Sequence, residues 1–95
     1  MDYIISEIIP KDGIMKDIHK EILGRKCYII ELEKGKSSLI KYFSGYSSGY
    51  HRLITSIVRD VEFSNDEKSV IIETTNTVYH LVESSCDGED VGEQI

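Results

Sequence analysis

The chain lacks several features that would place it in a familiar class. It has no tryptophan and no alanine but fifteen isoleucines, a bias typical of an AT-rich coding genome. No apolar run approaches the roughly 18 residues that a membrane-spanning helix needs. The first residues also lack the basic region and apolar stretch of a secretory signal. We therefore expect a cytoplasmic protein that makes no contact with a membrane.

Cysteine and histidine are too scarce to predict a metal site. The two cysteines, Cys27 and Cys86, show no zinc-ligand spacing, and free thiols are expected for an intracellular pair. The three histidines, His19, His51 and His80, fall on separate predicted elements, so no single helix or strand could use them as ligands. We predict neither a metal nor a cofactor.

Enzyme motifs are missing as well. The sequence has no Gly-x-Ser-x-Gly motif, no phosphate-binding loop and no dinucleotide-binding fingerprint, since its glycines are widely scattered. We therefore predict that the chain is not an enzyme.

Charge is distributed unevenly along the chain, whose formal net charge is −6. Residues 11–52 contain nine Lys and Arg against five Asp and Glu, whereas residues 53–95 contain two against ten. Duplex DNA is not an expected partner at this balance, because binding its backbone requires several uncompensated cations. Residues 84–95 contain four acids and only two large apolar residues. They predict a flexible acidic tail after a single domain over residues 1–83.

The apolar patterns predict a mainly β domain. Isoleucines at helical spacing over residues 14–23, closed by Gly24, indicate one short helix. Strands are expected over residues 3–9, 26–33, 37–43, 51–63, 69–75 and 78–83. Turns are expected at Lys34 and Gly35 and at a left-handed Asn76, with a bend near residues 56–59. The predicted fold is a small antiparallel barrel, SH3-like or half-open, with five to six strands.

The most distinctive stretch is "YFSGYSSGYHR", residues 42–52. Tyrosine mixed with serine and glycine is the composition of antibody contact loops, so an eight-residue binding loop is predicted between two strands. In the alternative, Tyr46 and Tyr50 simply cover the end of the barrel. The candidate binding residues are Lys41, Tyr42, Tyr46, Tyr50, His51 and Arg52.

Two later stretches contain paired hydroxyl side chains. Thr55 and Ser56 are predicted to face residues 74–77 and to form hydrogen bonds across the sheet. The pattern "LITSIVRDVE" followed by "VIIETTNTVYHL" resembles one in small uncharacterised proteins of bacteria and their phages, a Thr-Ser-x-Val strand before a Thr-x-Asn-Thr/Ser-x-Tyr hairpin. The resemblance covers about a third of the chain. It implies a mobile-element protein, one that disarms a host system.

Three functions remain open at this stage. The favoured one is a non-enzymatic module that binds and inhibits a host defence protein. In the first alternative, an oligomer encloses a nucleotide-like anion with Lys41, Tyr46, Tyr50 and Arg52. In the second, a barrel binds single-stranded nucleic acid and stacks bases on Tyr42, Phe43 and Tyr46. A homo-oligomer is expected because "YIISEII" is apolar on both strand faces.

Overall fold

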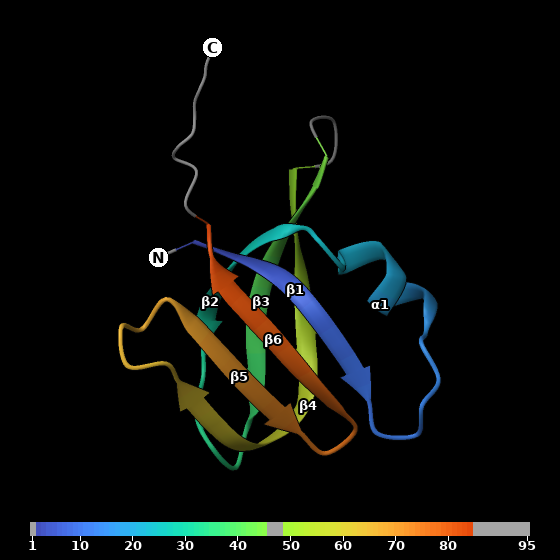
Figure 1. The fold of residues 1–95 in the computed structure, drawn as a ribbon. Coiled ribbons are helices and arrows are strands. Elements are labelled where there is room, and N and C mark those ends of the chain that lie inside the picture. The colour runs from blue at the N-terminus through green and yellow to red at the C-terminus, as the bar shows by residue number, and fades with distance from the viewer. Residues whose placement is uncertain (1, 46–48, 85–95) are drawn as a thin grey trace.

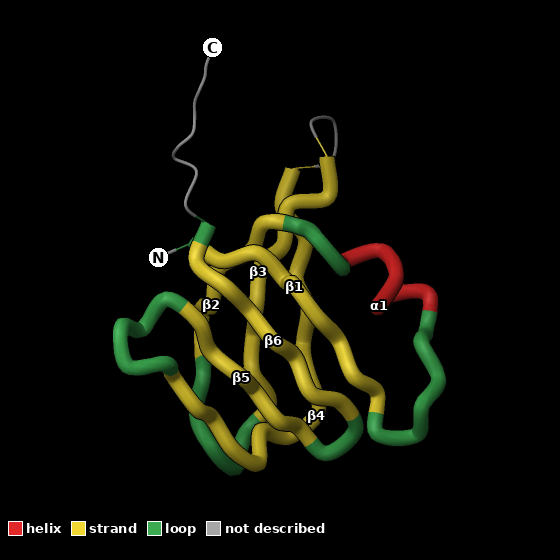
Figure 2. Tube along the Cα trace, viewed as in Figure 1, coloured by secondary structure: helices red, strands yellow, loops and turns green. Residues whose placement is uncertain are grey.

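The computed structural model describes residues 2–45 and 49–84. Six antiparallel strands form a closed barrel in sequence order, with one short helix beside β1 (Figure 1, Figure 2). The elements are β1 Tyr3–Pro10, α1 Asp17–Ile22, β2 Lys26–Glu31, β3 Ser37–Gly45, β4 Gly49–Phe63, β5 Ser69–Thr74 and β6 Thr77–Glu83. The predicted mainly β fold, a small antiparallel barrel with one helix within residues 14–23, is confirmed. The sheet is closed, because β1 pairs with both β2 and β6.

The core fills the inside of the barrel through the alternation of side chains along each strand. Successive residues of a strand point to opposite faces, so alternate side chains point into the barrel. The fully buried aliphatic residues of the strands are Ile5, Ile40, Val58, Val70, Ile72 and Leu81. Each such side chain contributes about 1.5–3 kcal/mol on burial. Apolar alternation in every strand therefore specifies the barrel.

The helix covers the side on which β1 and β2 diverge. These two strands pair only at Tyr3 with Cys27 and at Ile4 with Lys26. Beyond that point, the backbone N–H of Ile5 donates to Arg25 O and that of Gly24 donates to Ile5 O. The segment that follows α1 thus continues along β1 in place of a β2 pairing.

The apolar face of α1 differs from the predicted one. His19 and Ile22 are buried, whereas Ile14 and Ile18 are exposed. The helix begins only at Asp17, because Asp12 Oδ1 accepts from the backbone N–H of Ile14 and holds that segment in a turn. Ile14 therefore precedes the helix, which changes the face that meets the barrel.

The predicted bend in the long strand β4 is present. Leu39 pairs with Ile54 and Ser37 with Ile57, so β4 contains one extra residue opposite β3. A second irregularity, between Val58 and Asp60, lies opposite β5. Because bulges bend a strand and increase its twist, the first half of β4 pairs with β3 and the second half with β5.

The turns only partly follow the sequence prediction. Gly35 has φ +90° in the β2–β3 connection and Gly24 has φ +82° after α1, both as expected. The prediction of a left-handed conformation at Asn76 is wrong, since Glu67 is the one non-glycine residue with positive φ in the described part of the chain. Instead, Thr74 Oγ1 accepts from the backbone N–H of Thr77 at 3.0 Å and donates to Thr77 O at 2.8 Å. A buried hydroxyl closes this turn.

The hydroxyl-rich segments contact one another only in part as predicted, because Ser56 bonds the 74–77 segment whereas Thr55 bonds β3. The backbone N–H of Asn76 donates to Ser56 Oγ at 3.2 Å, and Thr75 Oγ1 donates to Ile57 O at 3.4 Å. Thr55 Oγ1 accepts from the backbone N–H of Ser38 at 2.9 Å. These side chains therefore tie neighbouring strands together.

The barrel occupies most of the predicted domain. It ends with β6 at Glu83, and the backbone N–H of Ser84 still donates to Asp2 O. Residues 85–95, nearly all of the predicted acidic tail, lie outside the described residues, as do Cys86 and Tyr46. In the part of the chain that is described, no helix has the length and apolar character needed to cross a membrane.

Candidate functional site

The tyrosine-rich stretch is mostly paired strand, so the predicted eight-residue loop is wrong. Phe43 pairs with Tyr50 and Gly45 with Gly49, which leaves residues 46–48 between β3 and β4. Ser44 Oγ donates to Gly49 O at 2.9 Å and joins the strands close to their ends. The two strands project beyond the rest of the barrel at this end (Figure 1). Aromatic residues are favoured in strands, and here they extend the hairpin.

Tyr42 and His51 occupy the inward face of this hairpin. Tyr42 is buried, and its hydroxyl donates to Glu21 Oε2 of α1 at 3.2 Å. Burial and, after it, the Glu21 carboxylate raise the pKa of Tyr42. His51 is exposed and lies against the Tyr42 ring, with ring centroids 5.9 Å apart. Tyr42 therefore fastens α1 to the barrel and is not available as a contact residue.

Three aromatic rings gather on the outward face. Directly opposed residues of paired strands point to the same side, which places Phe43 and Tyr50 together outside. Their ring centroids are 5.4 Å apart, and Tyr28 of β2 lies 5.3 Å from Tyr50, both in edge-on geometry. Tyr50 nevertheless remains 43% exposed. The rings hold one another in place and still present an aromatic surface.

Two cations lie in the next row of the same face. Lys41 pairs with Tyr28 on one side and with Arg52 on the other, so the three side chains cross the sheet in register. Within residues 2–45 and 49–84, neither Lys41 nor Arg52 has an ion pair or a side-chain hydrogen bond. Both charges are therefore available to an acidic partner.

Aliphatic side chains form the row after the cations. Leu39 and Ile54 pair across β3 and β4, and Ile54 is 69% exposed. Ile57, beyond the bulge, is also exposed. We define the β2–β4 face as the outward side chains Tyr28, Leu39, Lys41, Phe43, Tyr50, Arg52, Ile54 and Ile57. Three kinds of side chain therefore lie in order along it: rings, cations and aliphatics.

The β2–β4 face brings together three of the six residues predicted from sequence. Lys41, Tyr50 and Arg52 belong to it, His51 and Tyr42 lie on the other side of the same strands, and Tyr46 lies outside the described residues. Sequence reasoning missed Tyr28 and Ile54. Ile54 could have been found from the sequence, because it continues the alternation of Tyr50 and Arg52 by two residues. Tyr28 could not, because its place on the face depends on the register between β2 and β3.

Metal-ligating and nucleophilic side chains were the remaining candidates for a chemical site in the described residues. No group of three or more His, Cys, Asp or Glu side chains in that part of the chain could hold a metal ion. Burial, helped by the charge of Asp2, raises the pKa of the Cys27 thiol to about 12. A buried thiol of this kind stays protonated and is a poor nucleophile.

Comparison with protein-family models, curated proteins and solved structures finds no match to this chain.

Proposed function

We propose that the chain is a cytoplasmic, non-enzymatic protein-binding module that uses the β2–β4 face. The observation that carries this proposal is the order of side chains on that face: a ring cluster with Tyr50 exposed, two cations without an ion pair among the described residues, then the exposed Ile54 and Ile57. Aromatic residues and arginine dominate the energetics of protein interfaces. A face of this kind suits a partner surface that is apolar at its centre and carries carboxylates opposite Lys41 and Arg52.

The two alternatives have less support from the described residues. Stacking of single-stranded nucleic acid was expected to use Tyr42, but that ring is buried and bonded to Glu21. Tyr28 and Phe43 already pack edge-on against Tyr50. An enclosed nucleotide-like anion would need Lys41 and Arg52 from several subunits to meet around it.

The inhibition of a host defence protein belongs to this proposal as its biological setting. Its support is the resemblance of residues 53–62 and 70–81 to a pattern in small phage and bacterial proteins; these residues here form the bent part of β4 and the β5–β6 hairpin. That region lies apart from the β2–β4 face except at Ile54 and Ile57. The binding proposal therefore stands on the face itself and does not depend on the setting.

Two surface variants with matched controls test the proposal. We expect Arg52→Glu and Ile54→Asp to abolish capture of a protein from a bacterial extract, while Arg59→Glu and Ile71→Asp retain it. All four side chains are exposed, so each variant should fold. With the partner purified, the face variants should raise Kd about thirtyfold or more, as for interface hot spots. Binding should also weaken with added salt.

The same variants can contradict the proposal. A partner that binds the face variants and the controls with equal affinity would show that another surface is used. If instead a single-stranded oligonucleotide binds, and Arg52→Glu removes that binding, the nucleic-acid alternative replaces the protein partner.

A further inference from the structure

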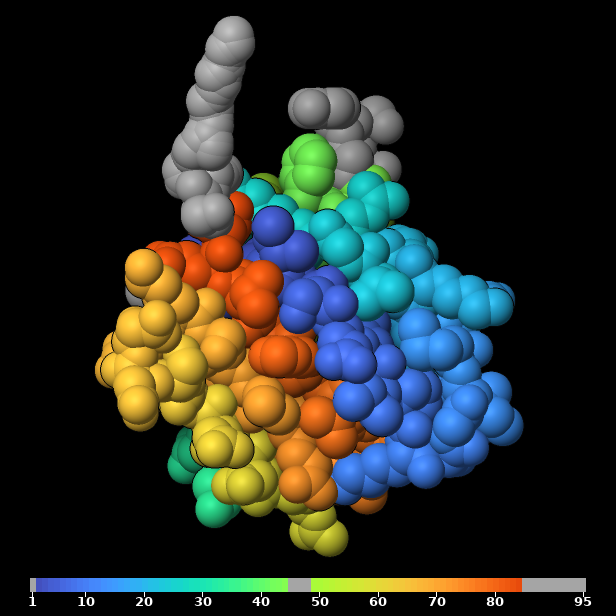
Figure 3. Space-filling model, in the orientation of Figure 1, coloured from blue at the N-terminus to red at the C-terminus, as the bar shows by residue number. Residues whose placement is uncertain are grey.

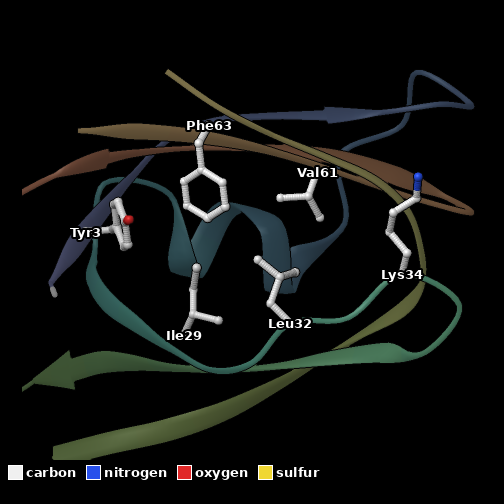
Figure 4. A pocket seen from close by; sticks show the side chains of 6 residues that line it. All are labelled: Tyr3, Ile29, Leu32, Lys34, Val61 and Phe63. Atoms are coloured by element: carbon white, nitrogen blue, oxygen red, sulfur yellow. The ribbon is translucent and has the colours of Figure 1, made fainter. Parts of the chain in front are cut away.

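A pocket of about 520 Å³ opens between β2 and the second half of β4. Its walls are Tyr3, Ile29, Leu32, Lys34, Val61 and Phe63. Val61 and Phe63 of β4 point toward Ile29 and Leu32 on the opposite wall (Figure 4). Tyr3 and Lys34 lie at opposite ends (Figure 4). The volume falls in the range of roughly 300–1,000 Å³ that small-molecule sites occupy.

The course of β4 explains why this space is open. The β2–β3 turn is joined to β4 at Val58, whose N–H donates to Lys36 O and whose carbonyl accepts from the N–H of Gly35. Beyond Val58, β4 bends away and pairs with β5, so β2 and the end of β4 separate. Phe63 stays 48% exposed although it faces other apolar groups.

The pocket walls fit an apolar chain. Five of the six lining residues are aliphatic or aromatic, and the ring of Phe63 faces Ile29 and Leu32 across the space. Transfer of apolar surface out of water is favourable, so a hydrocarbon chain between these walls would cover Phe63 and displace water from both sides.

The two ends of the pocket differ in charge. Lys34 is the single charged lining residue, and its ammonium group lies 3.7 Å from Asp60 Oδ1. Both side chains are largely exposed, and such surface pairs are weak, so an anion can compete with Asp60 for Lys34. At the opposite end, burial and then the carboxylates of Glu67 and Glu83 raise the pKa of Tyr3. An anionic group is therefore favoured at the Lys34 end and disfavoured at the Tyr3 end.

We propose that this pocket binds a small anionic amphiphile, a medium-chain carboxylate, with its chain between β2 and β4 and its carboxylate at Lys34 Nζ. The site is distinct from the β2–β4 face, because its lining side chains face the space between β2 and β4 and none of them belongs to that face. It does not rest on the proposed protein-binding function.

Methyl NMR with decanoate, below its micelle concentration, tests the site. We expect saturable shifts of the Ile29, Leu32 and Val61 methyl groups and no shift of Ile54 on the β2–β4 face. Lys34→Met should raise the Kd for decanoate about tenfold. Decanol should bind more weakly than decanoate, and Lys34→Met should not change its Kd. The matched control is Lys36→Met, which removes a charge from the same turn but not from this pocket.

A pocket-filling variant, Val61→Phe, should weaken decanoate and decanol alike. The inference is overturned if decanoate shifts none of the three pocket methyl groups. It is also overturned if Lys34→Met and Lys36→Met weaken decanoate equally, or if decyltrimethylammonium binds as tightly as decanoate. Loss of protein-partner binding in the β2–β4 face variants would leave these results unchanged, so the two proposals fail independently.

Discussion

At the residue scale, His19 is a side chain whose burial could not be predicted from the sequence. As a lone histidine on a short predicted helix, it gave no sign of its surroundings. In the structure it is buried, its Nδ1 accepts from the backbone N–H of Lys16 at 3.2 Å, and its ring meets Tyr79 edge-on. Burial, followed by the charge of Lys16, lowers the pKa of His19, while Asp12 opposes this effect. The native state therefore favours the neutral imidazole.

This burial predicts a pH dependence of stability. Because the pKa of His19 is lower in the folded state than its ordinary value of about 6.5, the unfolded chain binds a proton more readily. The contribution is fully present above about pH 6.5 and is lost as the pH falls below it. Denaturant titrations between pH 5 and 8 should show a loss of unfolding free energy on acidification.

Substitution separates His19 from other acid effects. His19→Asn retains an acceptor near the position of Nδ1 but cannot titrate, so its stability should vary less with pH. The control is His51→Asn, which alters an exposed ring and should preserve the wild-type slope. An undiminished acid sensitivity in His19→Asn would contradict the assignment.

At the element scale, the β5–β6 turn illustrates which local structures the sequence does and does not predict. The hairpin itself was predictable, because two alternating apolar strands flank a short polar segment. Its conformation was not, since Asn suits a left-handed turn and nothing local indicates that Thr74 is buried. The barrel buries Thr74, and its hydroxyl then satisfies both backbone groups of Thr77.

Removal of this hydroxyl should therefore be costly. Thr74→Val keeps the shape of the side chain but leaves the buried N–H and C=O of Thr77 without that partner, which costs about 1–3 kcal/mol of unfolding free energy. Thr75→Val, one residue away, loses only an exposed 3.4 Å bond and should change stability by less than about 0.5 kcal/mol. Equal effects in denaturant melts would show that the hydroxyl does not close the turn.

For the β3–β4 hairpin, the sequence predicted a loop where the structure has paired strands. Ser and Gly in "YFSGYSSGY" predicted a loop, but Phe43 and Tyr50 pair across the strands and extend the ladder to Gly45 and Gly49. Composition alone does not reveal that Phe43 lies opposite Tyr50. That pairing follows from the strand register, in which the core residues Ile40 and Leu53 lie opposite each other. The candidate residues were therefore partly right, while their geometry had to come from the fold.

At the scale of the whole molecule, the barrel presents two different apolar surfaces on opposite walls. The β2–β4 face lies on one wall. The other is formed by β1, β6 and β5, which face the viewer in Figure 3. There, Ile9 is 48% exposed and pairs with Val78. The stretch "YIISEII" was expected to be apolar on both strand faces, and on its outer face Ile4 is half-buried while Ile9 is exposed.

The charges on the two walls suit different occupants. In a two-fold dimer each face meets a copy of itself, so unpaired like charges would be brought together. The β2–β4 face carries unpaired Lys41 and Arg52. On the β1–β6 wall, Lys11 instead bonds Glu73 at 2.6 Å. Self-association is therefore favoured on the β1–β6 wall, and an acidic partner on the β2–β4 face.

The expected homo-oligomer can be tested with two matched variants, one on each wall. We predict that light scattering at high micromolar concentration gives twice the chain mass of 10.8 kDa. Ile9→Lys, which places a charge on the β1–β6 wall, should return the protein to that monomer mass. Ile54→Lys makes the same change on the β2–β4 face and should leave the dimer intact. A wild-type monomer would refute self-association, and a dimer broken only by Ile54→Lys would mean that the second copy occupies the β2–β4 face.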